Sequence, residues 1–115
     1  MMLGGGKHRG ERVLSRPSVQ TMTTDQLTPA QKAVSGFFPG YFDNRGWGFG
    51  LSVVTRRDHP AQPVGTFGWD GGLGTIWRSD RREDTVTILM TQCAWASPSP
   101  PNVYFWTLAY QAIDD

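Results

Sequence analysis

From Trp47 onward, apolar and polar positions alternate with a period of two, the pattern of half-buried β-strands. The first such run predicts one strand whose inward face carries Trp47, Phe49, Leu51 and Val53, with small residues opposite. Further strands are predicted at 64–70, 73–79 and 85–91. The last has apolar side chains on both faces, so we expect it to be covered on both sides and central in its sheet.

Helical signals flank this strand-rich region. Ser15 is a predicted N-cap with Pro17 in the first turn, and Val19 and Met22 then share one face. A second short helix is predicted from Pro29, because Thr28 and Gln31 have capping-box spacing. The segments 1–13, 35–45 and 56–63 are rich in glycine, proline or charge and are expected to be loops.

A third helix is predicted after the proline-rich segment 97–101, with Ser99 as N-cap and Pro100 in the first helical position. Apolar side chains then recur at helical spacing, at Val103, Trp106, Ala109, Tyr110 and Ile113. We expect this helix to lie across one sheet face. The predicted fold class is α+β, with an antiparallel sheet flanked by N- and C-terminal helices in a single unit, residues 1–115.

Charge and composition exclude several function classes. Eleven basic and 10 acidic residues among 115 give a net charge of +1, which offers no basis for binding nucleic acid or an anionic membrane. No apolar run approaches a membrane span, and the N-terminus lacks the apolar stretch of a signal peptide. The cytoplasm is therefore the default compartment, although the compartment itself stays open.

Metal and cofactor chemistry has little support in the sequence. A lone cysteine, Cys93, excludes an internal disulfide and a thiol zinc cluster, and we interpret it as a small buried hydrophobic residue. His8 and His59 lie in polar segments and are interpreted as exposed loop histidines. No metal site and no cofactor are expected.

The most unusual stretch is 67–75, where two aromatic residues, an acid and four glycines fall between two predicted strands. Glycine is unfavourable in a strand unless another backbone or a ligand comes close. A dinucleotide-binding loop needs a long helix after it, whereas a β-like run follows here, which argues against a nucleotide site. The glycines instead indicate a strand edge cleared for close approach.

The triplet Trp69-Asp70-Gly71 in this stretch resembles the strand motif of the serine β-lactamase and penicillin-binding-protein family, in particular its branch of β-lactamase-related esterases. That branch often has Trp-Gly-Gly, so Asp70 departs from its pattern. The resemblance extends from about Leu3 to Tyr110, through Ser15-Arg16-Pro17-Ser18, Met22-Thr23-Thr24 and Phe105-Trp106-Thr107-Leu108-Ala109-Tyr110. It implies a partial β-lactamase-like (transpeptidase-like) fold.

The same resemblance implies a function, hydrolysis of a small-molecule ester or amide, such as a β-lactam, through an acyl-serine. Trp69 would form the floor of the acyl pocket, Asp70 would flank it, and Gly71 would complete the triplet. The backbone N–H of Gly72 would be one oxyanion donor, a group worth roughly 3 kcal/mol of barrier.

The other catalytic elements of that family are missing from the sequence. No serine has a lysine three residues later, and none of the three tyrosines begins a Tyr-x-Asn/Ser element. No complete catalytic set is present, and we expect the chain alone to be inactive. It is interpreted as the C-terminal segment of a longer enzyme, with a complementary N-terminal portion as a candidate partner. The alternative is a non-catalytic interaction module that retains the fold.

Overall fold

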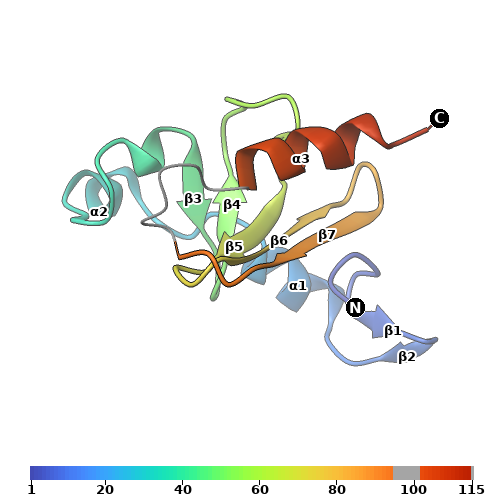
Figure 1. Cartoon of the computed structure of the whole chain (residues 1–115). Helices are drawn as coiled ribbons and strands as arrows, with labels where there is room; N and C mark the ends of the chain where they lie inside the picture. Colours follow the sequence, from blue (N-terminus) through green and yellow to red (C-terminus); the bar gives the residue numbers. More distant parts are fainter. Residues whose placement is uncertain (95–101, 115) are drawn as a thin grey trace.

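The computed structural model describes residues 1–94 and 102–114. Its centre is a five-stranded antiparallel sheet in which neighbouring strands follow the order of the chain. The strands are β3 (Arg45–Trp47), β4 (Ser52–Val54), β5 (Phe67–Asp70), β6 (Thr75–Asp80) and β7 (Thr85–Met90). Figure 1 shows helices on both sides of this sheet, which confirms the predicted α+β class.

The N-terminal segment is not the simple loop that its composition predicts. It contains a small hairpin of β1 (Lys7–His8) and β2 (Glu11–Arg12), which lies beside the main sheet rather than in it (Figure 1). Arg9 and Gly10 form the two-residue turn with φ of 49° and 88°. Positive φ at both positions suits the twist of a tight hairpin, which explains why a glycine-containing charged segment can pair.

Both predicted N-terminal helices are present. In α1 (Arg16–Met22), the Ser15 hydroxyl accepts a 3.1 Å hydrogen bond from the Ser18 N–H, and Val19 is buried. In α2 (Pro29–Ala33), Thr28 and Gln31 form the reciprocal capping box that their spacing predicts. A short 3₁₀ turn, η1 (Tyr41–Asp43), then leads into β3.

The prediction of one strand from Trp47 to Val53 is wrong. The segment forms two strands, β3 and β4, joined by a turn in which Gly50 has φ of 78°. A side chain at Gly48 would place its Cβ 1.9 Å from the Met22 carbonyl oxygen, so this glycine permits α1 to approach. Because the chain reverses here, the predicted common face does not exist: Phe49 is exposed while Leu51 and Val53 are buried.

Strands β5, β6 and β7 form two successive hairpins close to their predicted bounds. Trp69 pairs with Trp77, and Ile76 pairs with Leu89. The prediction that the last strand is central is wrong, because β7 lies at the edge of the sheet. Its outer stripe is more than half exposed, at Val86, Ile88 and Met90. Apolar side chains indicate which faces of a strand are buried. Whether neighbouring strands pair with both backbone edges is a separate matter, which the side-chain pattern does not reveal.

The helix α3 (Asn102–Gln111) packs on one face of the sheet (Figure 1). Trp106 is buried with Ala61 and Ile76, while the second core cluster contains Leu51, Val53 and Phe67. The predicted helix start at Ser99 and Pro100 lies outside the described residues. Cys93 is partly exposed, less buried than expected. Within the described ranges, no helix has the length and apolar character needed to cross a membrane.

Candidate functional site

A cavity of about 480 Å³ opens beside the end of β5, a volume in the usual range for small-molecule sites. Three of the four predicted site residues line it, Trp69, Asp70 and Gly72, whereas Gly71 is not in its wall. The rest of the wall comes from segments that the sequence did not single out: Phe37, Phe38, Tyr41, Asn44, Arg45, His59, Gln62, Arg78 and Trp106.

The backbone after β5 forms a tight turn. The Gly71 N–H donates to the Thr75 carbonyl at 2.8 Å, and the Gly74 N–H donates to the Gly71 carbonyl at 2.9 Å. Gly72 is exposed at the cavity, and within residues 1–94 and 102–114 its N–H has no hydrogen-bond partner. A free backbone N–H at a cavity rim is the kind of donor that an oxyanion site requires.

Aromatic side chains form one side of the cavity. The rings of Trp47 and Trp69 meet edge to face with centroids 4.7 Å apart, and Phe37 lies 6.0 Å from Trp69. Phe37 also contacts Tyr41 at 4.8 Å. Such pairs add about 0.5–1.5 kcal/mol each beyond the area they bury, so Trp69 is held in place by its neighbours.

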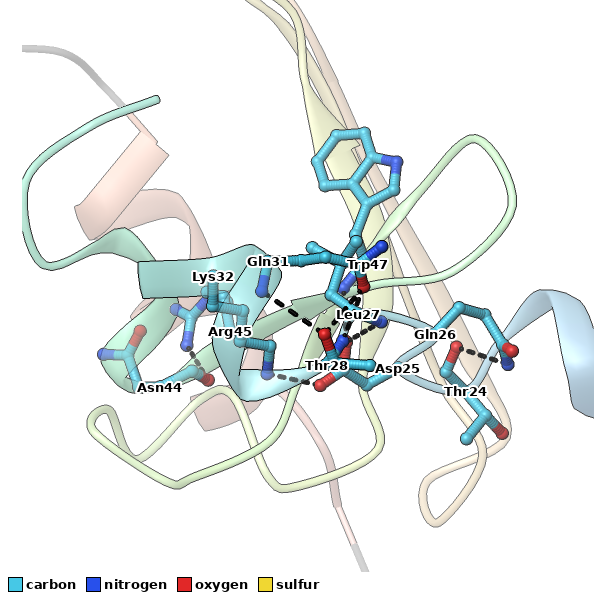
Figure 2. A network of polar contacts seen from close by, with 10 residues as sticks. All are labelled: Thr24, Asp25, Gln26, Leu27, Thr28, Gln31, Lys32, Asn44, Arg45 and Trp47. Carbon is cyan, nitrogen blue, oxygen red and sulfur yellow. Dashed lines mark hydrogen bonds and ion pairs between the residues drawn. The ribbon is translucent and has the colours of Figure 1, made fainter. Parts of the chain in front are cut away.

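The position of Trp47 depends on a polar network around Asp25 (Figure 2). One carboxylate oxygen, Oδ1, accepts hydrogen bonds from the backbone N–H groups of Trp47 and Leu27, both at 3.1 Å, while Oδ2 pairs with Lys32. A Cβ at Gly46 would overlap the Asp25 side chain. Asp25 therefore joins the segment after α1 to the start of the sheet.

This network makes a pH-dependent contribution to stability. Burial alone would raise the pKa of Asp25, but the contact with Lys32 and the two N–H donors outweigh it and lower that pKa below its usual value. A lowered pKa in the folded state stabilises the fold above about pH 4, and that contribution is lost as pH falls further. We expect Asp25→Asn to lower the free energy of unfolding by about 2 kcal/mol at neutral pH and to flatten its fall in acid.

Urea titrations from neutral to acidic pH measure both effects. Asp43→Asn is the matched control, because Asp43 is exposed and the same single charge is removed from η1. An Asp25→Asn variant whose unfolding free energy equals that of the parent at neutral pH would contradict the structural role of this carboxylate.

Charged groups inside the cavity are paired with one another. Arg78 forms an ion pair with Asp70, and its Nη2 donates to Oδ2 at 2.7 Å. The other carboxylate oxygen, Oδ1, is fully buried against the same guanidinium without an aligned hydrogen bond. The guanidinium also lies over the Trp106 ring, 5.3 Å from its centroid, so α3 helps to fix it.

A second arginine is satisfied in the same way. Arg45 donates to Asp58 Oδ1 at 3.1 Å and to Gln62 Oε1 at 2.7 Å. His59, interpreted from sequence as an exposed loop residue, is partly buried and lines the cavity. Its Nδ1 accepts a 3.1 Å hydrogen bond from the Ala61 N–H, an arrangement available only to the neutral imidazole.

No nucleophile is assembled within the described part of the chain. Tyr41 donates to the Ser52 hydroxyl at 2.7 Å, and burial raises the pKa of Tyr41 above its usual value despite that hydrogen bond. Among these residues, no hydrogen bond joins a lysine to Ser52, and Lys32 pairs with Asp25 instead. Residues 1–94 and 102–114 also contain no cluster of His, Cys, Asp or Glu suited to a metal ion.

Sequence comparison gives two curated relatives and no matching family model. They are Protein Rv1367c of Mycobacterium tuberculosis (strain ATCC 25618 / H37Rv) and the uncharacterized protein MT1414 of the same species (strain CDC 1551 / Oshkosh). Each is 40% identical over 97 residues, which cover 80% of this chain and 24% of the relative. The chain thus spans about a quarter of the length of these proteins.

Solved structures give the fold. Unliganded simvastatin synthase (LovD) from Aspergillus terreus superposes with a TM-score of 0.70 at 17% identity, over 99% of this chain and 32% of its own. The LovD9 mutant of that enzyme gives 0.61 at 20% identity, over 87% of this chain and 31% of its own. The 115 residues therefore have part of a β-lactamase-like fold.

Proposed function

We propose that this chain forms the substrate-facing wall of an acyl-serine enzyme that acts on an ester or amide. The observation that carries the proposal is the cavity at the end of β5, where Trp69 provides an apolar surface and Gly72 presents an N–H that has no hydrogen-bond partner among the described residues. Structural similarity to simvastatin synthase, a serine acyltransferase, supports the same chemistry.

In the proposed reaction, a serine hydroxyl outside this chain adds to the substrate carbonyl carbon and passes its proton to a neighbouring base. The carbonyl oxygen becomes negatively charged, and the Gly72 N–H donates to it together with the N–H of the serine. Collapse of the intermediate expels the alcohol or amine, which takes up a proton, and leaves the acyl-serine. Water or a second alcohol then accepts the acyl group.

The chain therefore contributes binding and oxyanion stabilisation, and the nucleophile comes from a complementary portion. The proposal predicts no acyl-serine turnover for the 115-residue chain alone. Mixing it with the part of Protein Rv1367c that the sequence match leaves uncovered should produce hydrolysis of a short-chain p-nitrophenyl ester. The match covers only 24% of that relative, so a large complement is available.

Mass spectrometry of the mixture distinguishes this enzyme from a non-catalytic interaction module. An acyl adduct on a serine of the complement, formed only when this chain is present, supports the proposal. Association of the two polypeptides without any adduct or product would favour the module. A stable adduct on a serine of this chain alone would overturn the assignment of the nucleophile to the complement.

A further inference from the structure

The cavity is lined largely by apolar surface, yet its wall also contains two arginines. The charge state of these arginines decides what kind of ligand the cavity accepts. An uncompensated guanidinium in such a site would attract a carboxylate, because planar bidentate pairing with anions is the interaction that arginine favours. The state of Arg45 and Arg78 therefore determines whether the cavity selects an anion or an uncharged molecule.

Both guanidinium groups are already neutralised by the protein. Arg78 is paired with Asp70 inside the cavity wall, and the side chains of the two residues are only 10% and 15% exposed. Arg45 is paired with Asp58 and also donates to Gln62. Among the described residues that line the cavity, the only other basic side chain is His59, and its Nδ1 accepts a hydrogen bond from the Ala61 N–H.

We propose that Asp70 is a specificity-determining residue, which cancels the charge of Arg78 so that the cavity selects uncharged ligands with an apolar or aromatic group and rejects carboxylates. The inference rests on the proposed function for the identity of the cavity as the substrate site. It assigns the substrate class as neutral esters or amides of apolar acyl groups.

The structure supplies the two elements of this selectivity. Apolar contact comes from Trp69, Phe37 and Trp106, which are among the residues that line the cavity. Rejection of anions follows because a ligand carboxylate would lose its hydration without gaining a free cation and would lie beside the Asp70 carboxylate.

Binding to the 115-residue chain tests the proposal without any catalysis. The probes are methyl phenylacetate, which is neutral, and phenylacetate, which has the same aromatic group and carries a carboxylate. Nitrogen-15 NMR titrations report binding through the indole N–H of Trp69 and the N–H of Gly72. We expect the ester to bind the parent chain at least about tenfold more tightly than the acid.

The decisive variant is Asp70→Asn, which keeps the shape of the side chain and releases Arg78. We expect phenylacetate to bind this variant about tenfold more tightly than it binds the parent, with the affinity for the ester changed less than about threefold. The matched control is Asp84→Asn, which removes the same charge from the exposed β6–β7 turn, where φ of 48° suits asparagine. It should leave both affinities unchanged.

A double variant, Asp70→Asn with Arg78→Gln, removes both charges and should retain the preference for the ester. If Asp70→Asn alone fails to fold, the parent and the double variant still decide the question. Equal or tighter binding of phenylacetate by the parent would overturn the charge-cancelling role while leaving the wall function intact. Binding of neither probe to the parent would instead argue against the cavity as the substrate site.

Discussion

Replacing Gly72 with proline should lower the turnover of the reconstituted enzyme by about 10²–10³-fold, the usual cost of losing one oxyanion donor. Proline lacks the backbone N–H, so this substitution removes the proposed donor. The N–H has no partner within the described residues, so no internal hydrogen bond is sacrificed. Initial rates with a p-nitrophenyl ester at saturating complement measure the effect on kcat.

Gly72→Ala provides a matched control that keeps the N–H. A Cβ at this position would meet no atom within 4 Å, and the residue does not adopt a left-handed conformation. Alanine should therefore retain most of the turnover, whereas proline lowers it by about 10²–10³-fold. The affinity of both variants for the complement, measured by calorimetry, should equal that of the parent. Normal turnover by an assembled Gly72→Pro variant would exclude this N–H as the oxyanion donor.

Gly68→Ala should unfold the chain or reduce its free energy of unfolding by at least about 3 kcal/mol, the upper range for overpacking. Gly68 pairs with Arg78 across β5 and β6. A Cβ there would lie 2.1 Å from the Trp77 carbonyl oxygen and 3.0 Å from the Arg78 Cα. These are backbone atoms, so the overlap is relieved only by separating the two strands that border the cavity.

Thermal unfolding measured by circular dichroism tests this expectation. Domains of about 100 residues lose roughly 4–8 °C for each kcal/mol, so the melting temperature should fall by more than about 10 °C. Gly36→Ala is the control, because its Cβ would meet open space in a segment outside the sheet. A Gly68→Ala variant that melts with the parent would show that the strand pairing described here is wrong.

Local signals in the sequence were sufficient for much of the fold. Caps at Ser15 and Thr28 identified both short helices, because a side chain that satisfies a helix N–H acts within three residues. Period-two alternation located β5, β6 and β7 to within a few residues. Alternation failed at 47–53, where the glycines that seemed to form the outer face of a strand instead allow a turn and a close approach of α1.

Part of the candidate site could be predicted in the same way. The glycine-rich stretch and its resemblance to a known motif indicated Trp69, Asp70 and Gly72, and all three line the cavity. The rest of the wall was missed, because residues such as Phe37 and His59 come from segments without periodicity. The sequence shows that these residues are aromatic or carry an imidazole, but no local pattern indicates that they lie near the end of β5.

The sequence by itself determined the strands β5, β6 and β7, the two N-terminal helix caps, the fold class and the glycine-rich edge, because each depends on neighbours within a few positions. Only the tertiary structure decided that β7 is an edge strand and that Arg78 lies against Asp70. Strand order and ion pairing depend on which distant segments meet. Whether a strand edge is paired is decided by backbone N–H and C=O groups, which every residue carries, so the side-chain pattern does not reveal it. The charge state of the cavity is therefore a property of the fold, set when strand register places a cation beside an acid eight residues away.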